Sequence, residues 1–124
     1  MSRLFFLAGA LSAAVAVVLG AFGAHALRAR LTPEALAVFE VGVRYQMYHA
    51  VALLAVALGA TRWPGEGMTL AGWLFVAGTV IFSGSLYLLV YTGQKWLGAV
   101  TPVGGAAFIV GWLVLAWTVW TAGP

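Results

Sequence analysis

The feature that most constrains this chain is a run of 21 residues, from Leu4 to Ala24, without a single charged side chain. Built as an α-helix that rises roughly 1.5 Å per residue, such a run is about 31 Å long and can cross the hydrocarbon core of a bilayer. Three further apolar stretches follow, separated by short segments with polar residues, Pro or Gly. The predicted transmembrane spans are 4–24, 45–61, 70–91 and 102–121.

Charged side chains are too rare for a soluble domain of this length. They make up 7% of the 124 residues, whereas soluble domains carry about 25%. The six basic and three acidic side chains are also too few to build a nucleic-acid surface, and the absence of cysteine excludes disulfides and thiolate metal sites. We therefore predict one all-α domain over residues 1–124, a four-helix transmembrane bundle with no cofactor and no nucleic-acid partner.

The second helix has a clear start signal. Thr32 suits the N-cap, Pro33 suits the first helical position, and Glu34 favours the positive end of the helix dipole. The helical pattern then continues for longer than a bilayer requires. We predict that residues 33–44 form an amphipathic extension at or just outside the membrane interface, with Gly42 as a place where the helix can bend.

Small residues recur at helical spacing along the first span. They are Gly9, Ala13, Ala16, Gly20 and Ala24. Such a stripe lets another helix approach closely, so we expect it to support self-association or docking into a larger membrane complex. The stripe and the length of the run favour a retained span over a cleaved signal peptide, although Ala24-His25-Ala26 has the small-x-small form of a cleavage site.

Four spans place both termini on one side of the membrane. We call it side A; it also holds Arg62. The opposite side, side B, holds Arg28, Arg30 and Lys95, with Arg44 nearby. Because cytoplasmic loops carry an excess of Lys and Arg, side B is the predicted cytoplasmic side, and the termini are expected on the non-cytoplasmic side.

Most polar and ionisable residues of the spans are predicted to lie toward side B, whereas tryptophans form an interfacial belt on side A. Ionisable residues within membranes are costly and often functional. The candidate polar cluster comprises His25, Glu40, Arg44, Tyr45, Gln46, Tyr48, His49, Ser83, Ser85 and Tyr87.

Helix geometry divides this cluster. Glu40 and Arg44 lie one turn apart and can form an ion pair, which is the favoured interpretation; an anionic ligand or a proton path is the alternative. His49 lies about 180° from Glu40, at 100° per residue, so the two side chains cannot share a site on one helix. His25 and His49 are expected at similar depths. Hydrogen bonds between helices explain them more simply than haem ligation does.

Ser83-Gly84-Ser85 lies in the middle of the third span. It can mark a substrate path or an unwound segment. Close packing of helices, with the hydroxyl groups bonded back to the backbone, is the favoured interpretation.

Four segments together carry a family resemblance. They are Gly20-Ala21-Phe22-Gly23-Ala24-His25, the stretch from Glu40 to Ala50, Ser83-Gly84-Ser85-Leu86-Tyr87, and Thr101-Pro102-Val103-Gly104-Gly105. The chain resembles the domain of unknown function 423 family over nearly its whole length, and transmembrane protein 256 of eukaryotes is similar. The resemblance implies a small multi-pass protein of the bacterial inner membrane and supplies no activity. The ten cluster residues are all present in the motifs of that family.

No nucleophile elbow, zinc-protease motif, phosphate-binding loop or dinucleotide fingerprint is present. We expect a non-enzymatic structural or accessory membrane component, in contact with lipid and assembled as a homo-oligomer or within a larger complex. Two alternatives stay open. One is an oligomeric pathway for a small molecule or an ion, and the other is a lipid- or amphiphile-binding protein that uses the polar cluster near side B.

Overall fold

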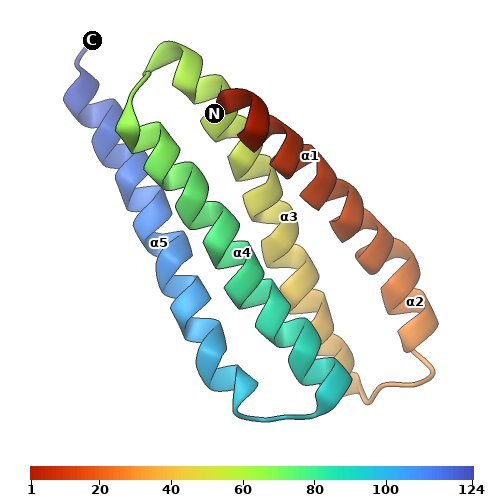
Figure 1. Cartoon of the computed structure of the whole chain (residues 1–124). Coiled ribbons are helices and arrows are strands. Elements are labelled where there is room, and N and C mark those ends of the chain that lie inside the picture. Colours follow the sequence, from red (N-terminus) through yellow and green to blue (C-terminus); the bar gives the residue numbers. More distant parts are fainter.

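The computed structural model describes all 124 residues and contains helices only. The elements are α1 (Ser2–Val17), a π-helical segment η1 (Val18–Gly23), α2 (Ala24–Leu27), α3 (Pro33–Arg62), α4 (Glu66–Thr92) and α5 (Leu97–Ala122). Since α1, η1 and α2 form one continuous segment, four helical segments are long and apolar enough to cross a membrane. The prediction of an all-α four-helix transmembrane bundle is confirmed, and both termini lie at the same end of it (Figure 1).

Local sequence signals set the ends of the central helices. The Thr32 hydroxyl accepts a hydrogen bond from the backbone N–H of Ala35 at 3.1 Å, so Thr32 caps α3 as its residue type predicts. The helix ends at Arg62, shortly before Pro64. At the end of α4, Gly93 adopts the left-handed conformation (φ 72°), which only glycine enters without strain.

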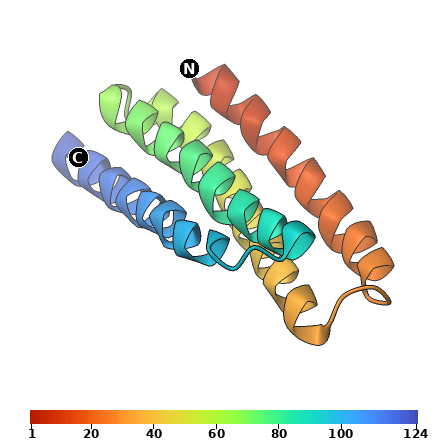
Figure 2. The ribbon, with the colours of Figure 1, turned by 60° about the horizontal axis from the view of Figure 1, so that its bottom comes forward.

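The helices are arranged in the order α1, α3, α4, α5. α1 packs on α3, α3 on α4, and α4 on α5, whereas α1 and α5 lie at opposite edges (Figures 1 and 2). α1 approaches α4 only near side A, where the rings of Phe5 and Trp73 meet edge to face at 5.3 Å. The apolar core lies mainly in this half of the bundle and includes Phe5, Val56 and Phe75.

The small-residue stripe of the first span faces α3. A Cβ atom on Gly9 would lie 2.7 Å from the carbonyl oxygen of Ala50, and one on Gly20 would lie 3.1 Å from Val43. Ala16 is also buried. The close approach expected from these residues is therefore made within the chain, between the first helical segment and α3.

Two local features differ from the expectations. α3 continues through Gly42 without interruption, because the missing side chain makes room for the Tyr87 ring rather than for a bend. α5 begins at Leu97, ahead of the predicted span, with Pro102 inside it. Pro102 is the sixth residue of α5, so the backbone bond to the Gly98 carbonyl is missing there, and the helix continues on both sides of it.

Candidate functional site

The structure divides the ten residues of the predicted polar cluster into an interior group and an outer group. Buried between helices are Gln46, His49, Ser83 and Ser85. Tyr87 is half buried, and the residues exposed on helix surfaces are His25, Glu40, Arg44, Tyr45 and Tyr48. The cluster is therefore not a single site.

The Gln46 amide joins three helices. Its Nε2 donates to the carbonyl oxygen of Ser12 on α1 at 3.0 Å, and its Oε1 accepts the Tyr87 hydroxyl of α4 at 2.7 Å. In a membrane, a buried amide without partners would be costly, so pairing both ends of this group holds the helices in one register.

The two serines of α4 connect it to its two main neighbours. The Ser83 hydroxyl donates to the carbonyl oxygen of Gly42 on α3 at 2.6 Å. The Ser85 hydroxyl oxygen lies 2.5 Å from that of Thr101 on α5 and bonds back to the Phe82 carbonyl at 2.9 Å. α4 is a continuous helix here, without an unwound segment.

His49 is held at both ring nitrogens. Nδ1 lies 2.8 Å from the carbonyl oxygen of Tyr45, and the Trp112 indole N–H of α5 donates to Nε2 at 3.0 Å. Because an indole can only donate, Nε2 accepts and Nδ1 carries the proton. The ring also stacks on Phe108, with centroids 3.5 Å apart and planes inclined by 5°. Neither nitrogen is left to ligate a haem or a metal.

The similar depth expected for the two histidines is wrong. His25 lies in α2, at the end of the first helical segment, whereas Ala50, next to His49, packs against Gly9 of α1. These two levels are about 24 Å apart along the helix, at roughly 1.5 Å per residue. The histidines therefore cannot be the two axial ligands of one haem, and nowhere do three His, Asp or Glu side chains gather as a metal site would need.

Trp112, which is 46% exposed on α5, was not predicted as the partner of His49. The position of Trp112 in the middle of the fourth span could have indicated this role. Membrane tryptophans are enriched at the interfaces, and an indole N–H at the depth of the hydrocarbon needs an acceptor. The acceptor itself cannot be read from the sequence, since it depends on how α3 and α5 pack.

Three residues of the outer group lie in one line along α3. Glu40, Arg44 and Tyr48 follow one another at intervals of four residues, and Val51 and Leu58 continue the same exposed surface. We call these five residues the α3 outer face. The ion pair expected between Glu40 and Arg44 is not formed, because no carboxylate oxygen lies within 4.0 Å of an Arg or Lys nitrogen.

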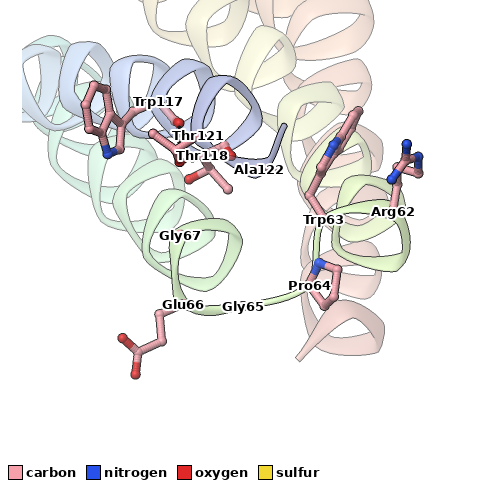
Figure 3. Close-up of a pocket in the computed structure, with 10 residues that line it drawn as sticks. All are labelled: Arg62, Trp63, Pro64, Gly65, Glu66, Gly67, Trp117, Thr118, Thr121 and Ala122. Carbon is pink, nitrogen blue, oxygen red and sulfur yellow. Dashed lines mark hydrogen bonds between the residues drawn. The ribbon is translucent and has the colours of Figure 1, made fainter. Parts of the chain in front are cut away.

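A hollow of about 520 Å³ opens on side A between the α3–α4 turn and the end of α5 (Figure 3). The hydroxyl groups of Thr118 and Thr121 bond back to carbonyl oxygens of α5. The Glu66 side chain points away from α5, and the Arg62 guanidinium lies over the Trp63 ring, 5.5 Å from its centroid. No set of polar groups converges on this hollow.

Comparisons with known proteins agree with the membrane fold. The family model described as protein of unknown function DUF423 matches residues 19–105. UPF0382 membrane protein YwdK of Bacillus subtilis (strain 168) is 49% identical over 114 residues, which cover 91% of this chain and 93% of the relative. UPF0382 membrane protein SAB0533 of Staphylococcus aureus (strain bovine RF122 / ET3-1) is 48% identical over 115 residues, with 91% and 92% covered. No solved structure gives a significant match. The chain is a member of the DUF423 family of membrane proteins.

Proposed function

We propose that this protein is a non-enzymatic structural or accessory component of the bacterial inner membrane that acts through its outer surface. The observation that carries the proposal is that the Gln46 amide and the His49 ring, the two largest polar groups of the interior, are both fully engaged, although the Thr79 hydroxyl is buried without a partner. Gln46 bonds to two other helices, and both ring nitrogens of His49 have partners. Polar side chains paired in this way hold helices together. A substrate or an ion crossing the bundle would first have to displace these bonds.

The outer surface, in contrast, carries polar groups that have no partner in the chain. Glu40 and Arg44 are exposed on α3, and Arg28, Arg30 and Lys95 are exposed toward side B. Cations at that side favour a cytoplasmic location for it and a non-cytoplasmic location for the termini. Contacts with lipid or with other membrane proteins are the roles that such a surface supports.

Assembly in the native membrane and solute flux together test this role. We expect the protein to migrate in native gels of mildly solubilised membranes as a discrete assembly larger than a detergent-bound monomer of its 13.0 kDa chain. We expect no solute flux when it is reconstituted in liposomes. A strictly monomeric protein would overturn the proposal, as would a saturable flux abolished by His49→Ala in a variant that still folds.

The orientation has a separate test, because the chain has no cysteine of its own. Thr121→Cys lies at the end of α5 on side A, and Gln94→Cys lies in the α4–α5 loop on side B. A membrane-impermeant maleimide added to intact spheroplasts should label the first variant and spare the second. The reverse pattern would place the termini in the cytoplasm.

A further inference from the structure

A groove of about 380 Å³ opens on side B between the start of α3 and the end of α4, which lie at the same end of the bundle (Figure 1). Small-molecule sites in proteins have volumes of about 300–1,000 Å³, so the groove is large enough to hold part of a ligand. Its lining combines apolar side chains of both helices with two side chains of opposite charge: Ala35, Val38, Leu89, Val90, Glu34 and Lys95.

The depth of the groove follows from the lengths of its two helices. α3 has 30 residues and α4 has 27, so they are about 45 Å and 40 Å long at roughly 1.5 Å per residue. A bilayer with its headgroup layers is about 40–45 Å thick. Glu34 is the second residue of α3 and Lys95 follows the end of α4, so both charges lie in the headgroup layer of side B. Val38 and Leu89 lie about one helical turn deeper, at the border of the hydrocarbon.

Neither charge of the groove has a partner within the chain. Glu34 and Lys95 are exposed, and no carboxylate oxygen lies within 4.0 Å of an Arg or Lys nitrogen. The left-handed turn at Gly93 (φ 72°) ends α4, and Lys95 lines the groove just after this turn. A ligand that carries one positive and one negative group is complementary to the two side chains.

We propose that this groove binds a phospholipid whose headgroup carries a phosphate and a primary ammonium group, as that of phosphatidylethanolamine does. The phosphate pairs with the Lys95 ammonium, and the ammonium of the headgroup pairs with the Glu34 carboxylate. The upper part of an acyl chain lies along Val38 and Leu89, below the two charges. The inference goes beyond the proposed function, because it holds whether or not the chain assembles with other proteins.

The chemistry of the groove selects this headgroup among phospholipids. The anionic headgroup of phosphatidylglycerol offers a phosphate to Lys95 but no cation to Glu34. The quaternary ammonium of phosphatidylcholine cannot donate a hydrogen bond and is recognised by aromatic side chains, of which the groove has none. A primary ammonium has three donors, so it can form charge-assisted hydrogen bonds with the Glu34 carboxylate.

The apolar walls favour a lipid over a soluble zwitterion. Ala35, Val38, Leu89 and Val90 are only partly buried by the chain itself. They lie near the border of the hydrocarbon, where acyl chains surround the helices. A lipid therefore reaches both the charged and the apolar parts of the groove, whereas a soluble zwitterion would contact only the charges.

Native mass spectrometry of the full chain released from lipid nanodiscs tests this inference. The nanodiscs contain equal amounts of phosphatidylethanolamine and phosphatidylcholine with identical acyl chains, so one spectrum compares two lipids that differ only in the methyl groups on the ammonium. We expect phosphatidylethanolamine to be retained about two- to fivefold more than phosphatidylcholine, the range given by one exposed charge pair. Equal retention of the two lipids, or retention of neither, would overturn the inference.

Charge variants assign the two ends of the headgroup. Glu34→Gln should bring the ratio of the two lipids to one, because Glu34 distinguishes their ammonium groups. Lys95→Gln should lower the retention of both lipids by about two- to fivefold, because both carry the phosphate. Glu40→Gln on the α3 outer face and Arg28→Gln at the end of α2 are matched controls that remove exposed charges outside the groove. Controls that change retention as much as the groove variants would contradict the proposed site.

A filled groove and a soluble competitor test the apolar part of the site. Val38→Trp occupies the groove and should lower the retention of both lipids, whereas unchanged retention would place the lipid elsewhere. Excess soluble phosphoethanolamine should not displace the lipid, and displacement would mean that the headgroup alone is bound. Circular dichroism verifies that every variant keeps the helical content of the wild type. A chain that retains the lipid but migrates as a monomer in native gels would overturn the proposed function and leave this inference in place.

Discussion

The Trp112 indole N–H of α5 donates to Nε2 of His49 on α3, with 3.0 Å between the two nitrogens. α3 and α5 have no close backbone approach, since α4 lies beside both of them. α3 and α5 therefore meet through side chains: this bond, the stacking of His49 on Phe108, and the contact of the Tyr45 ring with Phe108. A histidine in a membrane span, often a sign of function, here fixes the arrangement of two helices.

Replacing Trp112 by Phe measures how much the bond between Trp112 and His49 stabilises the protein, because it removes the donor and keeps an aromatic ring. We expect a loss of about 1 kcal/mol in the free energy of unfolding, a typical value for one hydrogen bond between membrane helices. The measurement is unfolding in detergent micelles followed by circular dichroism. Trp120→Phe is the control, since Trp120 is 82% exposed, and an equal effect of the two changes would contradict the assignment.

Gly42 offers a second test, of packing. A Cβ atom there would lie 2.7 Å from Cε1 of Tyr87, whereas a Cβ atom on Gly84 would meet nothing within 4 Å. Gly42→Ala should cost about 1–3 kcal/mol of stability, as overpacking does, and Gly84→Ala should be neutral or stabilising, since alanine is the better helix former. The same unfolding measurement compares them. Gly42→Ala without a loss would mean that the α3–α4 contact adjusts freely.

How far the sequence predicts the structure depends on how local each feature is. The start of α3 was predictable because Thr32 and Pro33 act on the adjacent backbone. The separation of Glu40 from His49 was predictable because one helix fixes the angle between them. Glu40 is exposed and His49 is buried, in line with that angle.

The interior pairings were not predictable, because they join residues of different helices and are not local. The Gln46 amide needs partners, but which atoms it reaches depends on how α1 and α4 slide along α3. The depth of His49 was misjudged because the part of α3 expected outside the span packs beside the end of the first helical segment, where Gly20 meets Val43 and Gly23 meets Phe39. Sixteen residues of helix separate Pro33 from His49, so its ring reaches the level of Gly9, in the first half of α1. Register between helices is a property of packing, which one sequence does not reveal.

The junction at Gln46 can be measured as a coupling between residues. Gln46→Leu removes both hydrogen bonds, and Tyr87→Phe removes only the hydroxyl that donates to Oε1. If the bond exists, the double variant should lose less stability than the two single variants together, by roughly 0.5–1.5 kcal/mol. Additive effects in this double-mutant cycle would show that Tyr87 and Gln46 do not interact.

The N-cap of α3 can be tested by its effect on stability. Thr32→Ala removes the oxygen that accepts from the Ala35 N–H, so we expect a loss of about 1 kcal/mol in the free energy of unfolding, largely recovered by Thr32→Ser. Because fraying of the first turn ends well before Gln46 and His49, their hydrogen bonds to the other helices should not change. Thr61→Ala, at the other end of α3, is the control for loss of a hydroxyl that caps no helix start. Equal losses from Thr32→Ala and Thr61→Ala would contradict the role of Thr32 as the N-cap of α3.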